Sequence, residues 1–227
     1  AAEHRLRLSG MCYSAQIEAA YKKYVRMFGA LMSIKEFARL YVERERDARI
    51  KIPKAMDAAF MNPQTEEERG IKARIDAFNA QQATKLEQEV FKQRKRRADA
   101  ERSLEAKMTK KATDELRIAT DKIARTMERL ADLKRTETRD SDSRIFPGVY
   151  APVMVWQGEQ RVVLPMRYQC RPSGKPAFYD TKYPGTYNAR RDNLEGFWKE
   201  LFGFSHGIMI VNAFYENVAR DGKNAVL

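Results

Sequence analysis

The sequence predicts an α+β protein, in which a β-rich core with short helices is interrupted by a long helical hairpin. Two differences in composition predict this. Residues 64–138 are dominated by Glu, Lys, Arg, Ala and Gln, which favour helices, and they contain no proline. The flanking segments hold most of the aromatic residues and glycines, which favour strands and turns. We therefore expect a discontinuous core (residues 11–62 and 139–227) and a helical insertion (residues 63–138).

The first part of the core shows two helical patterns. Apolar residues recur at helical spacing in residues 17–25, which predicts an amphipathic helix. Ser33 is followed by Glu36 at the start of a second apolar pattern, residues 34–41. Serine with glutamate three positions later is typical of a capping box, so we expect a second helix to begin after Ser33.

The insertion reads as two long helices. Thr65 followed by three glutamates favours a helix N-terminus, because acidic side chains complement the helix dipole there. Its apolar residues fall into stripes at helical spacing, which predict a hairpin with a coiled-coil seam. The stripes contain Ile71, Ile75, Phe78, Leu86, Val90 and Phe91, and then Leu116, Ile123, Met127, Leu130 and Lys134. Such a seam can close within one chain or between two, so self-association or a protein partner is an open alternative. The basic run of residues 92–97 either follows a phosphate backbone or forms a solvated helix face.

The last part of the core predicts strands. Residues 149–156 and residues 160–164 each have a strand-like sequence. Residues 157–159 between them are turn-like, so this segment predicts a β-hairpin. Residues 193–202 have helical spacing, and residues 207–211 form a short apolar run that suits a buried strand.

Charge favours a polyanionic partner. Lys and Arg total 43 against 31 Asp and Glu, a formal net charge of +12. Such an excess favours nucleic acid, because neutralised phosphates release counterions, although a basic protein without that role is an equal alternative on charge alone.

The two cysteines are too few for a disulfide scaffold, and no apolar run approaches the roughly 20 residues that cross a bilayer. We therefore expect a cytoplasmic protein without membrane contact.

Standard catalytic patterns are absent from the sequence. His4 and His206 lack metal-ligand spacing with the cysteines, and no glycine-rich phosphate loop occurs. We therefore expect neither a metal nor an organic cofactor. Cys170 is expected to be a buried or half-buried structural residue, which leaves Cys12 as the candidate nucleophile.

Cys12 follows Met11, and this order suggests a specific chemistry. If translation starts at Met11, removal of the methionine leaves Cys12 with a free α-amine beside its thiol. The amine, with a pKa of about 8, can attack an aldehyde, and the thiol can then close a thiazolidine ring. The aldehyde that DNA offers is the ring-opened sugar of an abasic site. We therefore expect residues 1–10 to be a tag or an upstream extension. Taken alone, however, such a cysteine is more often a small buried residue.

Four short motifs resemble the SRAP (SOS-response-associated peptidase) family. They are an N-terminal Met-Cys, a Met-Arg-aromatic strand, an Asn-Ala-Arg motif and a strand ending in aromatic-Tyr-Glu, at residues 11–15, 166–168, 184–190 and 211–216. The resemblance covers about half of the chain. It implies a partial barrel of mostly antiparallel strands that processes abasic sites in single-stranded DNA.

The resemblance also implies roles for five residues. Cys12 would form the covalent link, Asn188 would position the deoxyribose or the amine, and Glu216 would be the acid–base catalyst. Arg190 and Arg167 would bind DNA. From the residues alone, Asn188 equally suits a turn, Arg190 a surface charge and Glu216 a strand end.

The resulting hypothesis is an abasic-site processing enzyme that captures DNA covalently, with autoproteolysis as a second route to a free Cys12 amine. In a bacterium it would associate with the nucleoid. The family carries a further catalytic histidine downstream of the last motif, so we expect the chain to be C-terminally incomplete. The alternative is a non-catalytic helical module that binds nucleic acid or a protein.

Overall fold

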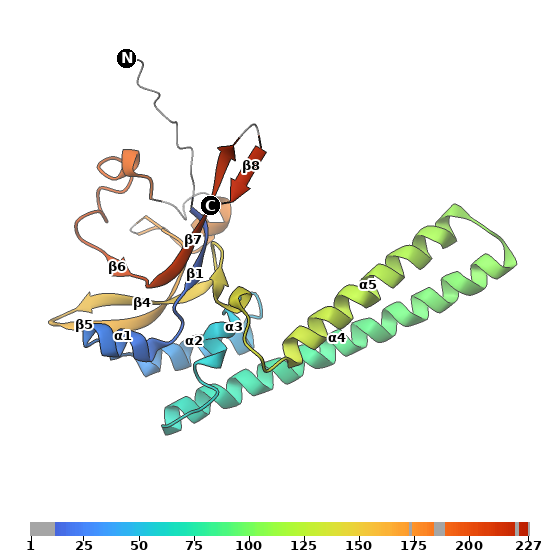
Figure 1. Cartoon of the computed structure of the whole chain (residues 1–227), viewed down its shortest axis with the longest axis horizontal. Helices are drawn as coiled ribbons and strands as arrows, with labels where there is room; N and C mark the ends of the chain where they lie inside the picture. Colours follow the sequence, from blue (N-terminus) through green and yellow to red (C-terminus); the bar gives the residue numbers. More distant parts are fainter. Residues whose placement is uncertain (1–11, 173, 184–188, 221–222, 227) are drawn as a thin grey trace, which may run out of the picture. The chain divides into compact units, whose positions relative to one another are not determined.

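The computed structural model describes residues 12–172, 174–183, 189–220 and 223–226, and it describes the backbone alone at residues 12, 13, 216–220 and 223–226. Helices and strands are both present, which confirms the α+β class (Figure 1). The chain divides into two compact units. The first unit runs up to Lys72 and resumes at Arg139, and the second is Ala73–Thr138.

The first unit contains two four-stranded sheets, with strand orders β3-β1-β7-β8 and β2-β5-β4-β6. Neighbouring strands are antiparallel except β2 and β5, which are parallel. The first sheet consists of β1 (Cys12–Ile17), β3 (Arg144–Ile145), β7 (Val211–Arg220) and β8 (Lys223–Val226). The second consists of β2 (Leu31–Met32), β4 (Tyr150–Gln157), β5 (Gln160–Arg167) and β6 (Gly207–Ile208). The hairpin expected around residues 157–159 is confirmed as β4 and β5.

Helix α1 (Tyr21–Phe28) is tied to both sheets by one hydroxyl. Tyr24 is fully buried, and its hydroxyl donates to the carbonyl of Pro152 in β4 at 2.9 Å. The same oxygen accepts from the amide of Ile210, just before β7, also at 2.9 Å. Burial raises the pKa of Tyr24 to about 12. The helix begins four residues later than the spacing predicts, because Ile17 pairs with Val211 in the sheet.

Helices α2 (Ile34–Arg46) and α3 (Lys54–Ala58) enclose an aromatic core. The ring of Phe60 lies within 6 Å of three others, at 5.8 Å from Tyr21, 5.9 Å from Phe37 and 5.7 Å from Tyr41. Helix α2 begins after Ser33 as expected, but the Ser33 side chain makes no capping hydrogen bond. The expected capping box is therefore wrong, although the helix start is right.

Helix α4 (Glu66–Ala106, 41 residues) begins where the run of glutamates predicts. The amide of Glu68 donates to Thr65 Oγ1 at 3.2 Å, so Thr65 caps the helix. The Glu68 carboxylate accepts from the Gln64 amide at 2.5 Å and from the Tyr21 hydroxyl. Burial would raise the pKa of Glu68, but these hydrogen bonds outweigh it and hold that pKa below its usual value.

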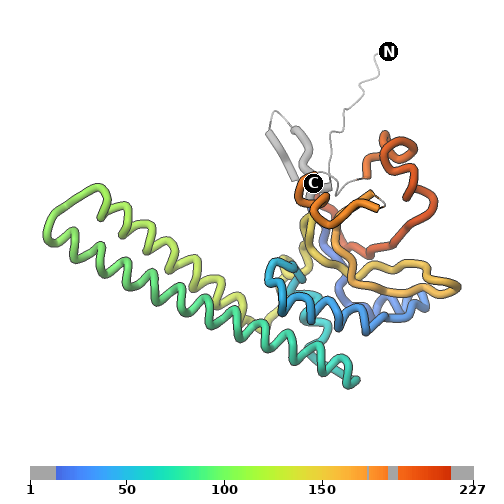
Figure 2. Tube along the Cα trace, turned by 180° about the vertical axis from the view of Figure 1, so that it is seen from behind, coloured from blue at the N-terminus to red at the C-terminus, as the bar shows by residue number. Residues whose placement is uncertain are grey.

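Within the second unit, α4 lies beside α5 (Lys110–Lys134) as an antiparallel pair (Figure 2). Two ion pairs cross between the helices, Lys134 with Glu87 at 2.9 Å and Arg96 with Glu115. The seam is lined with small side chains, since Ala100, Ala112 and Ala119 are buried. Val90 and Ile123 lie in it as expected. Phe91 and Met127 do not, because their side chains are 74% and 47% exposed.

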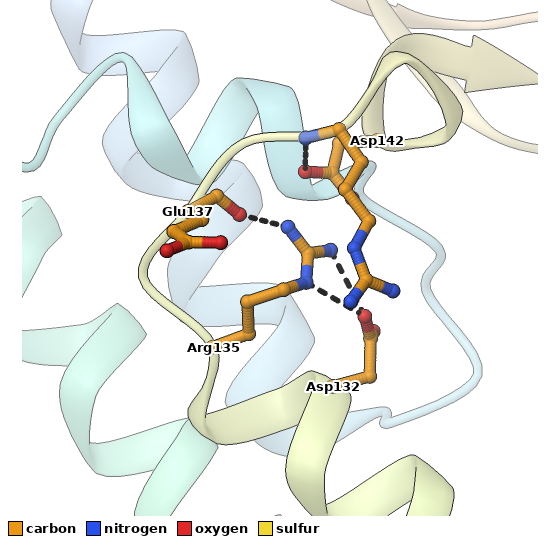
Figure 3. A network of polar contacts seen from close by, with 5 residues as sticks. Asp132, Arg135, Glu137 and Asp142 are labelled. Carbon is orange, nitrogen blue, oxygen red and sulfur yellow. Dashed lines mark hydrogen bonds and ion pairs between the residues drawn. The ribbon is translucent and has the colours of Figure 1, made fainter.

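The chain leaves α5 through a tight polar turn (Figure 3). Arg135 donates from Nε and Nη2 to Asp132 Oδ1 at 3.0 and 2.9 Å, and from Nη1 to the carbonyl of Glu137. Further on, the amide of Arg139 donates to Asp142 Oδ2 at 2.8 Å, at the start of a 3₁₀ turn, Asp140–Ser143.

Two sequence predictions in the last segment are wrong. Residues 193–202 form a 3₁₀ turn, Arg191–Asn193, followed by successive turns, instead of a regular helix. Gly196 lies inside this segment, and glycine costs about 1 kcal/mol in a helix interior. The apolar run 207–211 is divided between β6 and β7, and Ile208 is 55% exposed. A short helix, α6 (Phe178–Lys182), was not predicted. Among the described residues, no helix combines the length and apolarity needed to cross a bilayer.

Candidate functional site

Cys12 and Glu216, two of the predicted catalytic residues, lie directly opposite each other on neighbouring strands. Cys12 begins β1, and its Cα is paired with that of Glu216 in β7. Figure 1 shows the two strands side by side. The register shifts between Cys12 and Ser14, so that two residues of β1 oppose one of β7, as in a β-bulge. The side chains of Cys12 and Glu216 lie outside the described part of the structure.

A polar network begins two residues after Cys12. Ser14 is fully buried, and its hydroxyl accepts a hydrogen bond from Nε of Arg144 at 3.1 Å. The Arg144 guanidinium lies over the ring of Tyr215 at 4.0 Å and 5.5 Å from the ring of Phe146. The Tyr215 hydroxyl donates to Gln16 Oε1 at 3.3 Å. Since Tyr215 directly precedes Glu216, this network adjoins both predicted catalytic residues.

Arg144 is a functional candidate that sequence reasoning missed. It lies on β3, which pairs with the far side of β1 from β7. In the described part of the chain, its guanidinium contacts the faces of two aromatic rings and one hydroxyl. No local pattern identifies Arg144, because several arginines occur nearby and only strand pairing distinguishes this one from the rest.

Arg167, predicted to bind DNA, is engaged in an internal ion pair. It lies at the end of β5 and donates to Oδ2 of Asp180, a buried residue of α6. Arg171 approaches the same oxygen at 3.6 Å. The Asp180 carbonyl accepts from Gln169 Nε2 at 3.2 Å. Two arginines thus share one buried carboxylate, which leaves this corner of the protein with a net positive charge.

The Asn-Ala-Arg motif is described only in part. Asn188 lies outside the described residues. Arg190 is exposed and bonds to Asp192 through two hydrogen bonds of 3.1 and 3.0 Å, which lower the pKa of that carboxyl. Ala189, between Asn188 and Arg190, makes a backbone hydrogen bond to the thiol of Cys170. Burial raises the pKa of this thiol, and the hydrogen bond opposes that effect. Cys170 is half-buried, as expected, and its thiol contacts Ala189.

The described residues offer no group of three or more His, Cys, Asp or Glu side chains that could hold a metal ion. Among the residues that the structure describes, cavities lie within each of the two units. A smaller one of about 310 Å³ lies at the β4–β5 turn beside Gly29 and Leu31, and a larger one of about 550 Å³ lies in the helical hairpin. Neither includes the residues around Cys12.

No protein-family model, no curated protein and no solved structure matches this chain.

Proposed function

We propose that this protein captures abasic sites in single-stranded DNA covalently, through the amine and thiol of Cys12. The observation that carries the proposal is the pairing of Cys12 with Glu216 across β1 and β7. Residues directly opposite in an antiparallel pair have Cβ atoms about 5 Å apart. This register therefore suits a reaction in which a nucleophile and a proton carrier act on one small group.

The proposed reaction needs no oxidant, reductant or cofactor. The Cys12 amine attacks the aldehyde carbon of the ring-opened sugar and forms a carbinolamine. Glu216 protonates the carbinolamine hydroxyl, which leaves as water, and the resulting iminium ion returns its N–H proton to Glu216 to give an imine. The thiol then adds to the imine carbon, its proton passes to the nitrogen, and the thiazolidine ring is closed. Proton transfer by a positioned carboxylate contributes about 10²- to 10⁴-fold to such steps.

Arginines supply the remaining parts of the proposed site. Arg144 would place a cation beside the reacting sugar, where a phosphate flanks the lesion, because a guanidinium matches phosphate with a planar set of donors. Arg190 and Arg167 would bind further phosphates, and Asn188 would position the sugar or the amine, as the resemblance to the SRAP family implies. A partial barrel of that family would be the corresponding fold.

A free amine at Cys12 requires that the residues ahead of it are removed, by methionine processing or by self-cleavage. The test is therefore made with protein that begins at Cys12, mixed with single-stranded DNA that carries one abasic site and run on a denaturing gel. We expect a shifted band that resists denaturant and is absent with Cys12→Ala. Cys12→Ser keeps the amine, and should give a band only after borohydride reduction of the imine.

Two matched controls sharpen the result. A chain with one alanine ahead of Cys12 keeps the Cys12 thiol but converts its amine to an amide. A DNA with a tetrahydrofuran abasic-site analogue also lacks the base, but its sugar cannot open to an aldehyde. Neither should form the adduct. If all these samples behave like the parent protein, covalent capture is wrong, and the alternative of a non-catalytic helical interaction module is favoured.

A further inference from the structure

The second unit contains a cavity of about 550 Å³ between the last turns of α4 and the first turns of α5. Its lining is rich in long basic side chains. The lining residues are Lys92, Lys95, Arg96, Asp99, Ala100, Ser103, Thr109, Lys111, Ala112 and Glu115. From Lys92 to Ser103 the wall formed by α4 extends for about 16 Å, at 1.5 Å per residue.

The two carboxylates of this cavity are already neutralised. Glu115 accepts from Arg96 across the hairpin, and Asp99 accepts from Arg102 on its own helix. The pairing with Arg96 lowers the pKa of Glu115. The lysines of the cavity, Lys92, Lys95 and Lys111, are exposed and have no ion-pair partner among the residues that the structure describes. The cavity therefore carries a net positive charge.

The start of α5 adds to this positive potential. Thr109 caps the helix by accepting from the Ala112 amide at 3.2 Å, and the first turn contains no acidic residue. Lys110 and Lys111 occupy that turn instead. Cations are unfavourable at a helix N-terminus, where the dipole is positive. Lys111 lines the cavity together with Lys92 and Lys95, so this helix start favours an anionic ligand there.

We propose that this cavity binds the phosphodiester backbone of single-stranded DNA, independently of the chemistry at Cys12. Lys92 and Lys95 are three residues apart on one helix, so they suit successive phosphates. Phe91, which is 74% exposed, lies four residues before Lys95 on the same side of α4 and offers a ring for base stacking. A row of cations next to an exposed aromatic ring matches a nucleic-acid strand better than a single small anion.

The test uses the full chain with Cys12→Ala, which cannot form the covalent link, and undamaged labelled oligothymidine of about 20 nucleotides, longer than a typical single-strand site. Binding is measured by fluorescence anisotropy over a series of salt concentrations. Changing Lys92, Lys95 and Lys111 together to Gln should weaken binding by about tenfold or more. It should also reduce the slope of log K against log salt by about 2, since each lost single-strand phosphate contact removes about 0.7.

The matched control changes Lys85, Arg125 and Arg129 to Gln, because these residues are exposed on the same two helices but lie outside the cavity. It removes the same charge and should weaken binding by less than about twofold if the cavity is the site. Equal losses in the two triple variants, or no loss in the first, would overturn the proposal. Phe91→Ala should weaken binding about fivefold or more through lost stacking, and an unchanged affinity would overturn the assignment to nucleic acid.

Discussion

The guanidinium of Arg144 lies 4.0 Å from the centre of the Tyr215 ring, and Tyr215 directly precedes Glu216 on β7. Through its hydrogen bond to Ser14, the same guanidinium also contacts β1, the strand that begins at Cys12. One side chain therefore joins the two strands that carry the proposed nucleophile and proton carrier. Its charge, geometry and position can each be tested by substitution.

Arg144→Gln should slow formation of the DNA adduct by about tenfold, because a cation beside the sugar phosphate is lost. Arg144→Lys keeps the charge but not the planar stack, so it should recover part of that rate. The free energy of unfolding of Arg144→Gln should fall by about 1–3 kcal/mol, because two cation–π contacts and the hydrogen bond to the buried Ser14 hydroxyl are lost. Single-turnover rates and urea denaturation measure the two effects. A large loss of stability with no specific loss of rate would make Arg144 merely structural.

Glu216→Gln should slow adduct formation by about 100-fold, since an amide keeps the shape of the carboxylate but cannot carry a proton. The pH dependence of the rate should then lose the limb that reports this carboxyl group. Glu216→Asp serves as the conservative control and should retain more of the rate than Gln does. Equal rates for the three proteins would remove Glu216 from the proposed mechanism.

Tyr24→Phe should reduce the free energy of unfolding by about 1–3 kcal/mol at pH 8, because the Pro152 carbonyl and the Ile210 amide both lose a buried partner. The pKa of Tyr24 is raised to about 12, against about 10 in the unfolded chain. The contribution of the hydroxyl is thus fully present below pH 10 and is lost as the pH rises towards 12. At pH 11 this loss is about 1.4 kcal/mol.

The measurement for Tyr24 is the difference in stability between the parent protein and Tyr24→Phe, from denaturant titrations between pH 8 and 11. The difference should shrink as the pH rises. Other buried tyrosines, such as Tyr41, are present in both proteins and cancel. A difference that stays constant over this range would contradict the role assigned to the hydroxyl.

Glu68→Gln should destabilise the protein by about 2 kcal/mol at pH 7, since two donors lose a charged acceptor. The folded-state pKa of Glu68 is lowered, so its contribution is present above the unfolded value of about 4.3 and is lost as the pH falls through the folded value. At pH values below 4, the urea concentration at the unfolding midpoint should therefore decrease more steeply with falling pH for the parent protein than for Glu68→Gln. Parallel midpoints would contradict a lowered pKa for Glu68 in the folded protein.

The helical hairpin was the most predictable part of the fold. Its composition excludes strands, and Thr65 with its glutamates marks the start of α4 correctly. The seam was less predictable, because alanines such as Ala119 occupy it while Phe91 points into solvent. A repeat of apolar residues identifies a helix face, but close packing between two helices selects small side chains that carry little hydrophobic signal.

The candidate site was predictable only where its residues lie in recognisable motifs. Cys12 and Glu216 are paired in the sheet, as a shared site requires, and both were chosen from the sequence. Arg144 was not, because its proximity to Ser14 depends on strand pairing between residues far apart in the chain. Likewise, the buried Asp180 that binds Arg167 lies on a short helix with no periodic signal. Long-range pairing of single polar residues leaves little trace in local sequence.

The crossed ion pairs of the hairpin also restrict how its length can change. Glu87 pairs with Lys134 and Arg96 with Glu115, which favours one antiparallel register of the two helices. A deletion in α4 alone would shift the rest of that helix along α5. The partners of each ion pair beyond the deletion would then be too far apart to interact. A deletion of seven residues, two turns, from each helix would restore the facing surfaces. The helical hairpin can therefore be shortened or lengthened by equal numbers of residues in its two helices. The core sequence that flanks the hairpin stays unchanged.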